Sequence, residues 1–162
     1  MNKWFETHSP EETHHLGERI GRLLKAGDIV LLFGDLGAGK TTLTQGIARG
    51  MGVGEDEYVR SPSFTLVNQY RGRIPAFHID LYRIESPGEL DDLGLEDALG
   101  REGVAIVEWA EKLFVEKQPH SLIQGIGGWI EIRLQITEKG SHTFDLSTHN
   151  MAPQSHSIFA LH

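Results

Sequence analysis

The sequence predicts a single small α/β domain built around a mixed, mainly parallel sheet with antiparallel additions. Helical patterns alternate with short apolar runs in the first part of the chain, and strand patterns dominate the last part. The length of 162 residues is close to that of one domain, and the 39% of hydrophobic residues can supply one core. We expect the domain to span residues 1–146 and residues 147–162, which are polar, to form a loose tail.

The first elements follow from capping and periodicity. Residues 9–12, Ser-Pro-Glu-Glu, form a capping box with proline at the first helical position. The helix behind them has one apolar face, made of Leu16, Ile20, Leu23 and Leu24, and Gly27 ends it. Residues 28–33 are suited to a buried strand. Residues 39 to about 51 should be helical, because apolar residues recur every four positions at Leu43, Ile47 and Met51.

Later elements are shorter. The glycine-rich, acidic residues 50–56 predict a loop, and Ser86-Pro87-Gly88-Glu89 repeats the capping pattern before a short helix. A turn is expected at residues 71–73. The remaining strands are expected at residues 65–70, 76–82, 104–107, 129–136 and about 142–146.

Charge and composition exclude several classes of protein. The chain has 15 basic and 23 acidic side chains, a net charge of −8, which argues against binding DNA, RNA or an anionic membrane by itself. The absence of cysteine excludes disulfides, a thiol nucleophile and cysteine-based metal sites. No apolar run approaches the ~18 residues of a membrane span, and the N-terminus lacks a secretory signal. We therefore expect a cytoplasmic protein.

The strongest motif is a phosphate-binding loop. Residues 34–41, GDLGAGKT, match G-x-x-x-x-G-K-[ST] between the predicted buried strand and the amphipathic helix, whereas a chance match is roughly a one per cent event. Glycines turn backbone N–H groups inward to form an anion site at a helix N-terminus. Lys40 is expected to reach the β- and γ-phosphates, and the Thr41 hydroxyl to bind Mg²⁺, which prefers oxygen ligands.

Two carboxylates are candidate partners of this loop. Glu108 follows the buried run 104–107, where phosphate-loop enzymes place a second carboxylate for Mg²⁺; alternatively it is simply the first solvated residue after a strand. Asp80 shares one strand face with His78 and Tyr82, and a carboxylate inside a strand is costly unless it is paired. Asp80 either orients the attacking water, binds Mg²⁺ through a water, or forms a salt bridge with a basic residue such as Arg83.

The segment Ser61-Pro62-Ser63-Phe64-Thr65 lies where switch segments of phosphate-loop enzymes usually occur. The hydroxyls of Ser61, Ser63 and Thr65 are suited to sensing the γ-phosphate or its metal, although an ordinary Ser-Pro turn explains the pattern equally well. Trp109 is either a reporter of the nucleotide or partner, or an ordinary core or rim aromatic. The nine histidines form no H-x₃-H or HExxH pattern, so we interpret them as solvated or hydrogen-bonded rather than zinc-binding.

The nucleotide is partly specified by what the sequence lacks. It contains no N-K-x-D guanine-reading motif, and no Arg-rich lid of a small-molecule kinase stands out. An ATPase or an ATP-driven switch remains.

Four segments together resemble the TsaE family, formerly YjeE, the bacterial ATPases required for threonylcarbamoyladenosine modification of tRNA. These segments are GDLGAGKTT at 34–42, SPSFTLV at 61–67, HIDLYR at 78–83 and VEW at 107–109, and the resemblance covers roughly residues 9–112. Ser63 departs from the family, which usually has threonine there, but the hydroxyl is kept.

The resemblance implies a small phosphate-loop domain that uses ATP and Mg²⁺. Residues Gly37, Ala38, Gly39, Lys40, Thr41 and Thr42 are implied to bind the phosphates, Thr41 and Glu108 to hold Mg²⁺, and Asp80 to assist hydrolysis. Implied partners are the TsaD and TsaB proteins, with tRNA engaged only through their complex. Two alternatives remain open: a stand-alone small-molecule kinase, and a nucleotide-dependent adaptor without hydrolysis, against which the presence of Asp80 and Glu108 argues.

Overall fold

The computed structural model of the chain describes residues 2–35, 37–62, 66–99, 102–151 and 157–161. Within these residues the main sheet has seven strands, which lie in the order β1 (Lys3–Thr7), β9 (His142–His149), β8 (Trp129–Ile136), β2 (Ile29–Phe33), β5 (Val104–Glu108), β4 (Ala76–Asp80) and β3 (Val67–Tyr70). A small hairpin pairs β6 (Phe114–Val115) with β7 (Gln118–Pro119). The helices are α1 (Pro10–Leu23), α2 (Lys40–Gly50), α3 (Pro87–Asp91), α4 (Ser121–Gln124) and the 3₁₀ turns η1 (Ala110–Leu113) and η3 (Ser157–Ala160).

The fold class predicted from the sequence is confirmed. Strands β8, β2, β5 and β4 are parallel neighbours, and β9, β1 and β3 join by antiparallel pairing. The phosphate-loop strand β2 lies between β8 and β5 and all five of its residues are buried. A strand buried on both faces reads as a continuous apolar run, which is why the segment IVLLF was recognisable.

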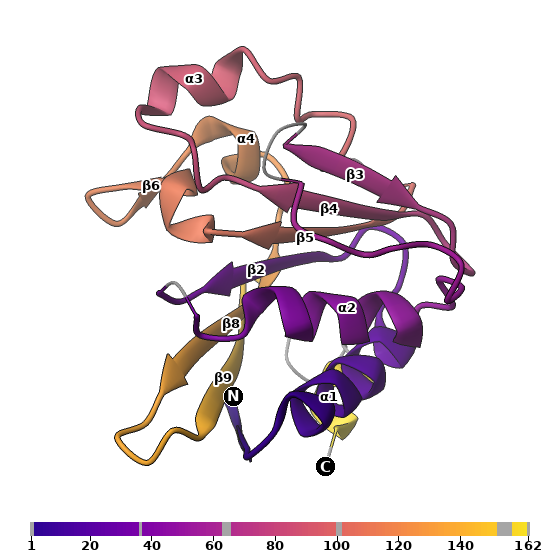
Figure 1. Cartoon of the computed structure of the whole chain (residues 1–162). Coiled ribbons are helices and arrows are strands. Elements are labelled where there is room, and N and C mark those ends of the chain that lie inside the picture. The colour runs from indigo at the N-terminus through magenta and orange to yellow at the C-terminus, as the bar shows by residue number, and fades with distance from the viewer. Residues whose placement is uncertain (1, 36, 63–65, 100–101, 152–156, 162) are drawn as a thin grey trace.

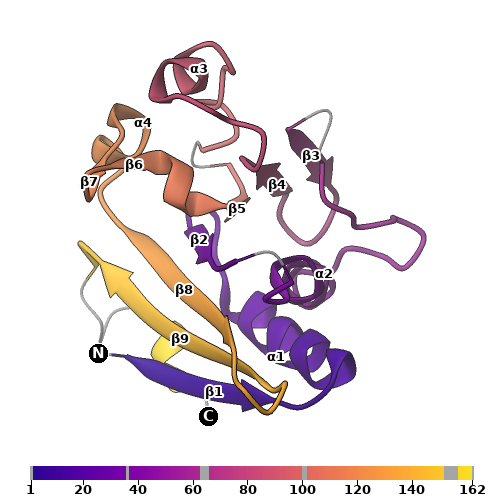
Figure 2. The ribbon, with the colours of Figure 1, turned by 60° about the vertical axis from the view of Figure 1, so that its left-hand side comes forward.

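Helices cover both faces of this sheet. Val30 and Leu32 of β2 contribute to the core beneath α1 and α2, whereas Ile29, Leu31 and Phe33 contribute to a second core beneath α3, η1 and α4. Figure 1 shows α1 and α2 below β2 and α3 and α4 above it, and the turned view in Figure 2 shows the same division. The site-bearing helix α2 therefore packs on one defined face of the sheet.

Helices α1 and α2 cross at glycines. A Cβ placed on Gly46 of α2 would lie 2.1 Å from the carbonyl oxygen of His14, and one on Gly21 of α1 would lie 2.1 Å from the carbonyl oxygen of Ile47. Gly17 and Gly50 approach the opposite backbone similarly. The four glycines let the two backbones touch, so α1 fixes the position of α2.

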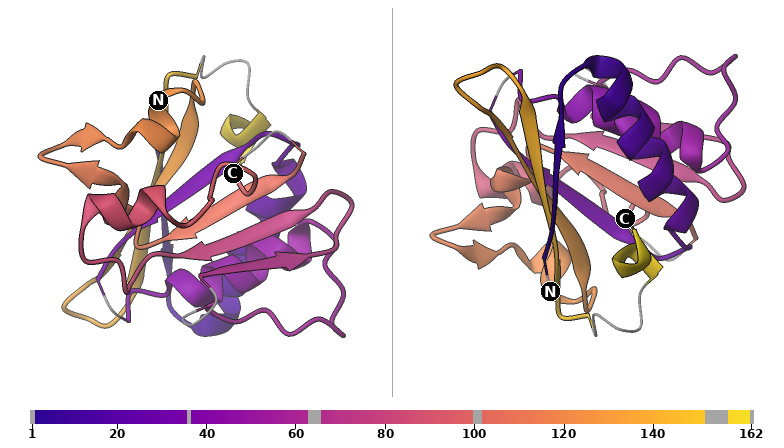
Figure 3. Two further views of the ribbon diagram at one scale, coloured as in Figure 1. Left: turned by 90° about the horizontal axis from the view of Figure 1, so that it is seen from above. Right: turned by 90° about the horizontal axis from the view of Figure 1, so that it is seen from below.

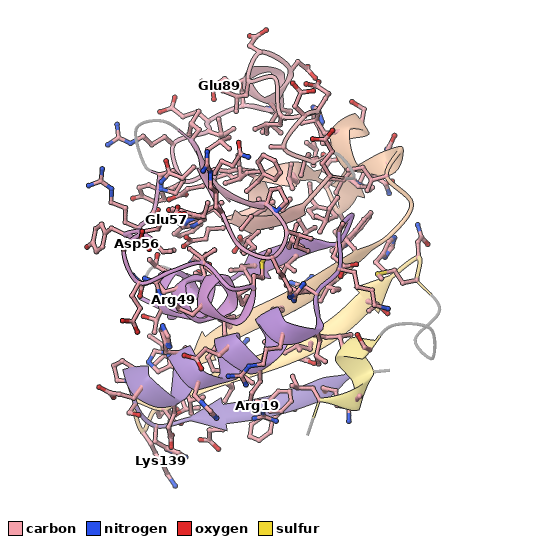
Figure 4. The ribbon with its side chains drawn as sticks, turned by 90° about the vertical axis from the view of Figure 1, so that its right-hand side faces the viewer. Arg19, Arg49, Asp56, Glu57, Glu89 and Lys139 are labelled. Carbon is pink, nitrogen blue, oxygen red and sulfur yellow. The ribbon has the colours of Figure 1, made fainter. Side chains whose placement is uncertain are left out.

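Helix α2 also holds the loop that follows it. Arg49 donates hydrogen bonds to the carbonyls of Val53 at 3.2 Å and Glu57 at 3.0 Å, and Gln45 donates to the carbonyl of Val59 at 2.8 Å. Figure 4 shows Arg49 and Glu57 on the same side of the molecule, beside α2. The chain thereby returns along α2 toward the phosphate loop and brings Ser61 to it.

The structure departs from the sequence analysis at both chain ends. Strand β1 was not predicted, because its alternation is short and polar; it pairs with β9 at the sheet edge, where Figure 3 (right) shows it in indigo. The tail expected from residue 147 is not loose in the described part, because β9 continues to His149. Ile158 and Leu161 are buried in the core under α1, and Ser157 Oγ donates to the carbonyl of Leu23 at 3.1 Å.

Within the described residues, no helix is both long enough and apolar enough to cross a membrane.

Candidate phosphate-binding site at the strand ends

Three parallel strands end side by side at the candidate site. Glu108 of β5 lies beside Leu32 of β2 on one side and beside Asp80 of β4 on the other. The carboxyl edge of a parallel sheet is where α/β proteins bind ligands. A cavity of about 440 Å³ opens there, lined by Gly37, Gly39, Lys40, Thr41, Thr42, Ser61, Asp80, Tyr82, Glu108 and Trp109. Most residues of the predicted site thus come together.

The loop backbone has the form that an anion site requires. Gly37 and Gly39 adopt φ values of 83° and 101°, which strongly favour glycine. Gly39 caps α2, and in the described structure no side chain bonds the N–H groups of the first helical turn as a cap. These N–H groups, together with the positive end of the helix dipole, are suited to phosphate oxygens.

Lys40 lies at the start of α2 and is only 5% exposed. Its ammonium donates hydrogen bonds to the carbonyls of Gly34 and, at 2.9 Å, Asp35, and it lies 3.9 Å from the centre of the Trp109 ring. Burial lowers the pKa of Lys40 below its ordinary value, and the negative charges of four surrounding carboxylates, led by Glu111 and Glu108, oppose this effect. Lys40 therefore provides a buried cationic side chain at the loop, which favours the binding of an anion.

Thr41 and Glu108 supply two oxygens at one point. Thr41 Oγ1 donates to Glu108 Oε1 at 3.0 Å, and Glu108 is 2% exposed. The alternative that Glu108 is a solvated residue after a strand is therefore wrong. A hydroxyl and a carboxylate fit Mg²⁺, which prefers hard oxygen ligands. Among the residues described, no group of three or more His, Cys, Asp or Glu side chains is arranged to hold a metal ion.

Asp80 joins the site to the proposed switch segment. The Ser61 hydroxyl donates to Asp80 Oδ2, and the backbone N–H of Tyr82 donates to Oδ1 at 2.9 Å. Asp80 is 5% exposed, so these bonds offset the cost of burying its charge. Ser63 and Thr65, the other two hydroxyls of the predicted switch, lie outside the described residues.

Trp109 lines the cavity. Its backbone is left-handed, with φ 57° and ψ 44°, an uncommon conformation for a bulky residue. Its ring contacts the Lys40 ammonium and the ring of Tyr82, whose centre is 5.0 Å away and which is half exposed. Trp109 thus contacts the phosphate-loop lysine directly, and its role as a reporter of the nucleotide stays a prediction.

Sequence reasoning missed three residues that the structure places beside the loop. His78 Nε2 bonds Glu108 Oε2, the N–H of Gly34 donates to Glu111 Oε2 at 3.0 Å, and His142 Nδ1 lies 2.9 Å from the carbonyl oxygen of Ala38. The only available signal was the shared strand face of His78 and Asp80. Glu111 and His142 come from a 3₁₀ turn and a late strand, whose approach to the loop depends on tertiary structure.

Comparison with known proteins gives a consistent result. A family model described as "Threonylcarbamoyl adenosine biosynthesis protein TsaE" matches residues 7–144. Proteins named "tRNA threonylcarbamoyladenosine biosynthesis protein TsaE" are similar to the chain. The one from Bacillus subtilis is 43% identical over 123 residues, which are 75% of this chain and 74% of the relative. The one from Rickettsia felis is 35% identical over 141 residues, 86% and 77% of the two chains.

A solved structure shares the fold. The crystal structure of YdiB from Bacillus subtilis superimposes with a TM-score of 0.74 at 28% sequence identity. The match covers 99% of this chain and 92% of that one.

Proposed function

This chain belongs to the TsaE family, and on that premise we propose that it is a Mg²⁺-dependent ATPase supporting a TsaB–TsaD protein pair in the threonylcarbamoyladenosine modification of tRNA. The observation that carries the proposal is the 3.0 Å contact of Thr41 with Glu108, beside the buried Lys40 at the start of α2. A loop that only turned the chain would not need a threonine, a lysine and a buried carboxylate at one point.

Residues 37–42 bind the phosphates of ATP in this proposal. The N–H groups at the start of α2 donate hydrogen bonds to the phosphate oxygens, and the Lys40 ammonium exchanges the carbonyls of Gly34 and Asp35 for phosphate oxygens. Thr41 and Glu108 would hold Mg²⁺, which would neutralise the negative charge that develops during phosphoryl transfer. Lys40 is already desolvated, so its attraction for phosphate is stronger than in water.

Asp80 and Ser61 act together on the attacking water. Asp80 Oδ2 accepts the Ser61 hydroxyl, and Oδ1 is held by the N–H of Tyr82. When Ser61 turns toward the γ-phosphate, Oδ2 is released to accept a hydrogen bond from water and orient it for in-line attack. In this proposal the switch segment couples recognition of ATP to its hydrolysis, and Trp109, whose ring contacts the Lys40 ammonium, senses the change.

The charge of the chain favours an indirect relation to tRNA. With a net charge of −8 the protein supplies little electrostatic attraction to a polyanion. In this proposal tRNA is therefore engaged through the partner complex, in the cytoplasm. The chain does not transfer the threonylcarbamoyl group in this scheme; it uses ATP to keep the transferase turning over.

The test is release of phosphate from ATP by the purified chain, with and without the TsaB–TsaD pair, alongside formation of the modified nucleoside. We expect slow hydrolysis alone, faster hydrolysis with the pair, and a higher Mg²⁺ requirement for both activities in Glu108→Ala. Asp92→Asn, which removes an exposed carboxylate at the end of α3, is the matched control and should behave as wild type. Label transferred from [γ-³²P]ATP to a small molecule instead of water would favour the kinase alternative and refute the proposal.

A further inference from the structure

His78 is a fully buried side chain next to the proposed metal ligand. It is 0% exposed and lies on β4, two residues before Asp80. The register of β4 and β5 places Asp80 beside Glu108 and His78 beside Ile106. His78 and Glu108 are therefore diagonal neighbours on one face of the sheet, and His78 Nε2 bonds Glu108 Oε2.

The two carboxylate oxygens of Glu108 have different hydrogen-bond partners. Oε2 is bonded by the imidazole, whereas Oε1 faces Thr41 Oγ1 at 3.0 Å. A carboxylate at the end of a long side chain can rotate and swing, and a fixed donor on one oxygen removes this freedom. We propose that His78 is a positioning residue, which holds Glu108 so that Oε1 meets Mg²⁺ together with Thr41. The inference rests on the proposed function, since it specifies how that metal site is oriented.

The tautomer of the imidazole follows from its surroundings. Glu108 Oε2 is an acceptor, so the ring proton belongs on Nε2. His78 Nδ1 has no hydrogen-bond partner among the described residues. A proton on Nδ1 would bury an unpaired N–H and turn the Nε2 lone pair toward the carboxylate, so the opposite tautomer is disfavoured on both sides.

Tyr70 supports the imidazole from the neighbouring strand. Its ring centre lies 6.3 Å from that of His78, and it is 6% exposed. The Tyr70 hydroxyl is held by the backbone of Arg60, whose N–H and carbonyl oxygen both lie 3.3 Å away. His78 is thus packed between Tyr70 and Glu108, and Tyr70 in turn contacts the residue before Ser61. This is the rigid support that a ligating carboxylate needs to keep its direction.

The experiment compares three substitutions of His78 by the Mg²⁺ dependence of nucleotide binding, measured with a fluorescent ADP analogue. His78→Gln places an amide N–H about where Nε2 lies, whereas His78→Asn is one bond too short and His78→Phe keeps the ring without the donor. Removing such a supporting contact typically weakens metal affinity about 10–100-fold. We expect that loss in the Asn and Phe variants, partial or full rescue in the Gln variant, and unchanged nucleotide binding in EDTA.

His14→Gln is the matched control. His14 pairs with Glu18 at 3.2 Å on the surface of α1, so it changes a His–Glu pair remote from the loop and should leave the Mg²⁺ dependence unaltered. A purely structural role for His78 would lower the melting temperature of the Asn and Phe variants without changing their Mg²⁺ dependence. That result would overturn the inference alone. Wild-type nucleotide binding that ignores Mg²⁺ would overturn the proposed function and the inference together.

A second measurement needs no folded variant. In ¹⁵N NMR spectra of the wild-type protein, the buried imidazole should carry its proton on Nε2, both without ligand and with Mg²⁺ and ADP. A ring that carries its only proton on Nδ1 in either state would refute the positioning role.

Discussion

Substituting Gly46 by alanine tests how tightly α1 fixes the phosphate-loop helix. The new Cβ would lie 2.1 Å from the carbonyl oxygen of His14, about 1.2 Å short of the ~3.3 Å at which carbon and carbonyl oxygen normally meet. The obstacle is backbone, so no side chain can rotate away and the helices must separate. Overpacking of this kind costs up to about 3 kcal/mol. Alanine returns about 1 kcal/mol of helix propensity, which leaves a net loss of about 2 kcal/mol.

For a chain of this size, that loss lowers the melting temperature by roughly 4–8 °C. The assay is thermal unfolding monitored by circular dichroism, with ADP binding measured on the same samples, because α2 carries Lys40 and Thr41. Gly88→Ala is the matched control: it is also a helical glycine, but among the described residues nothing lies within 4 Å of its new Cβ, so its stability should be unchanged or raised by up to ~1 kcal/mol. A Gly46→Ala variant as stable as Gly88→Ala would refute the close-contact argument.

Three further predictions concern the site. Lys40→Met should abolish stabilisation by ADP yet raise the melting temperature of the ligand-free chain at neutral pH. Burial lowers the Lys40 pKa, so the cost of burying the charged ammonium, which destabilises the wild-type fold, decreases as the pH rises toward 10.5. The stability advantage of Lys40→Met over wild type should therefore shrink between pH 8 and 10.5, and an advantage that stays constant would contradict this reasoning. Glu108→Ala should raise the Mg²⁺ concentration required for hydrolysis, whereas Asp80→Ala should lower kcat while ATP binding persists; equal Mg²⁺ profiles in the two variants would count against separate roles. Finally, the chain alone should not bind tRNA tightly at about 150 mM salt, and sub-micromolar, salt-sensitive binding in a filter or anisotropy assay would disprove it.

The phosphate loop and its carboxylates were predictable because local physics determines them. The motif at residues 34–41 needs specific residue types at fixed spacing, and Glu108 follows four apolar residues, three of them β-branched, that favour a buried strand. Parallel strands end at one edge, so the meeting of Asp80 and Glu108 follows once both strands are recognised. The roles of Ser63 and Thr65 stay predictions.

The remaining contacts depend on long-range structure or unusual backbone. Glu111 contacts Gly34 from the 3₁₀ turn that follows Trp109, whose left-handed conformation is one that sequence does not signal for a bulky residue. The bond between His78 and Glu108 requires the register of β4 on β5, and a shift of one residue would turn His78 to the opposite face. Strand β1 is visible only through its partner β9, more than 130 residues away.

That pairing has a consequence for how the protein is made. During synthesis the ribosome releases β1, α1, β2 and α2 first, and the two helices can dock at their glycines early. Strand β2, however, meets its neighbours β5 and β8 only after residues 104–108 and 129–136 emerge, and β1 must wait for β9. Until then the apolar edges of β2 lie open to pairing with other chains. High contact order of this kind slows folding, so a nascent chain carries a complete phosphate-loop motif well before the strands that complete its site have paired.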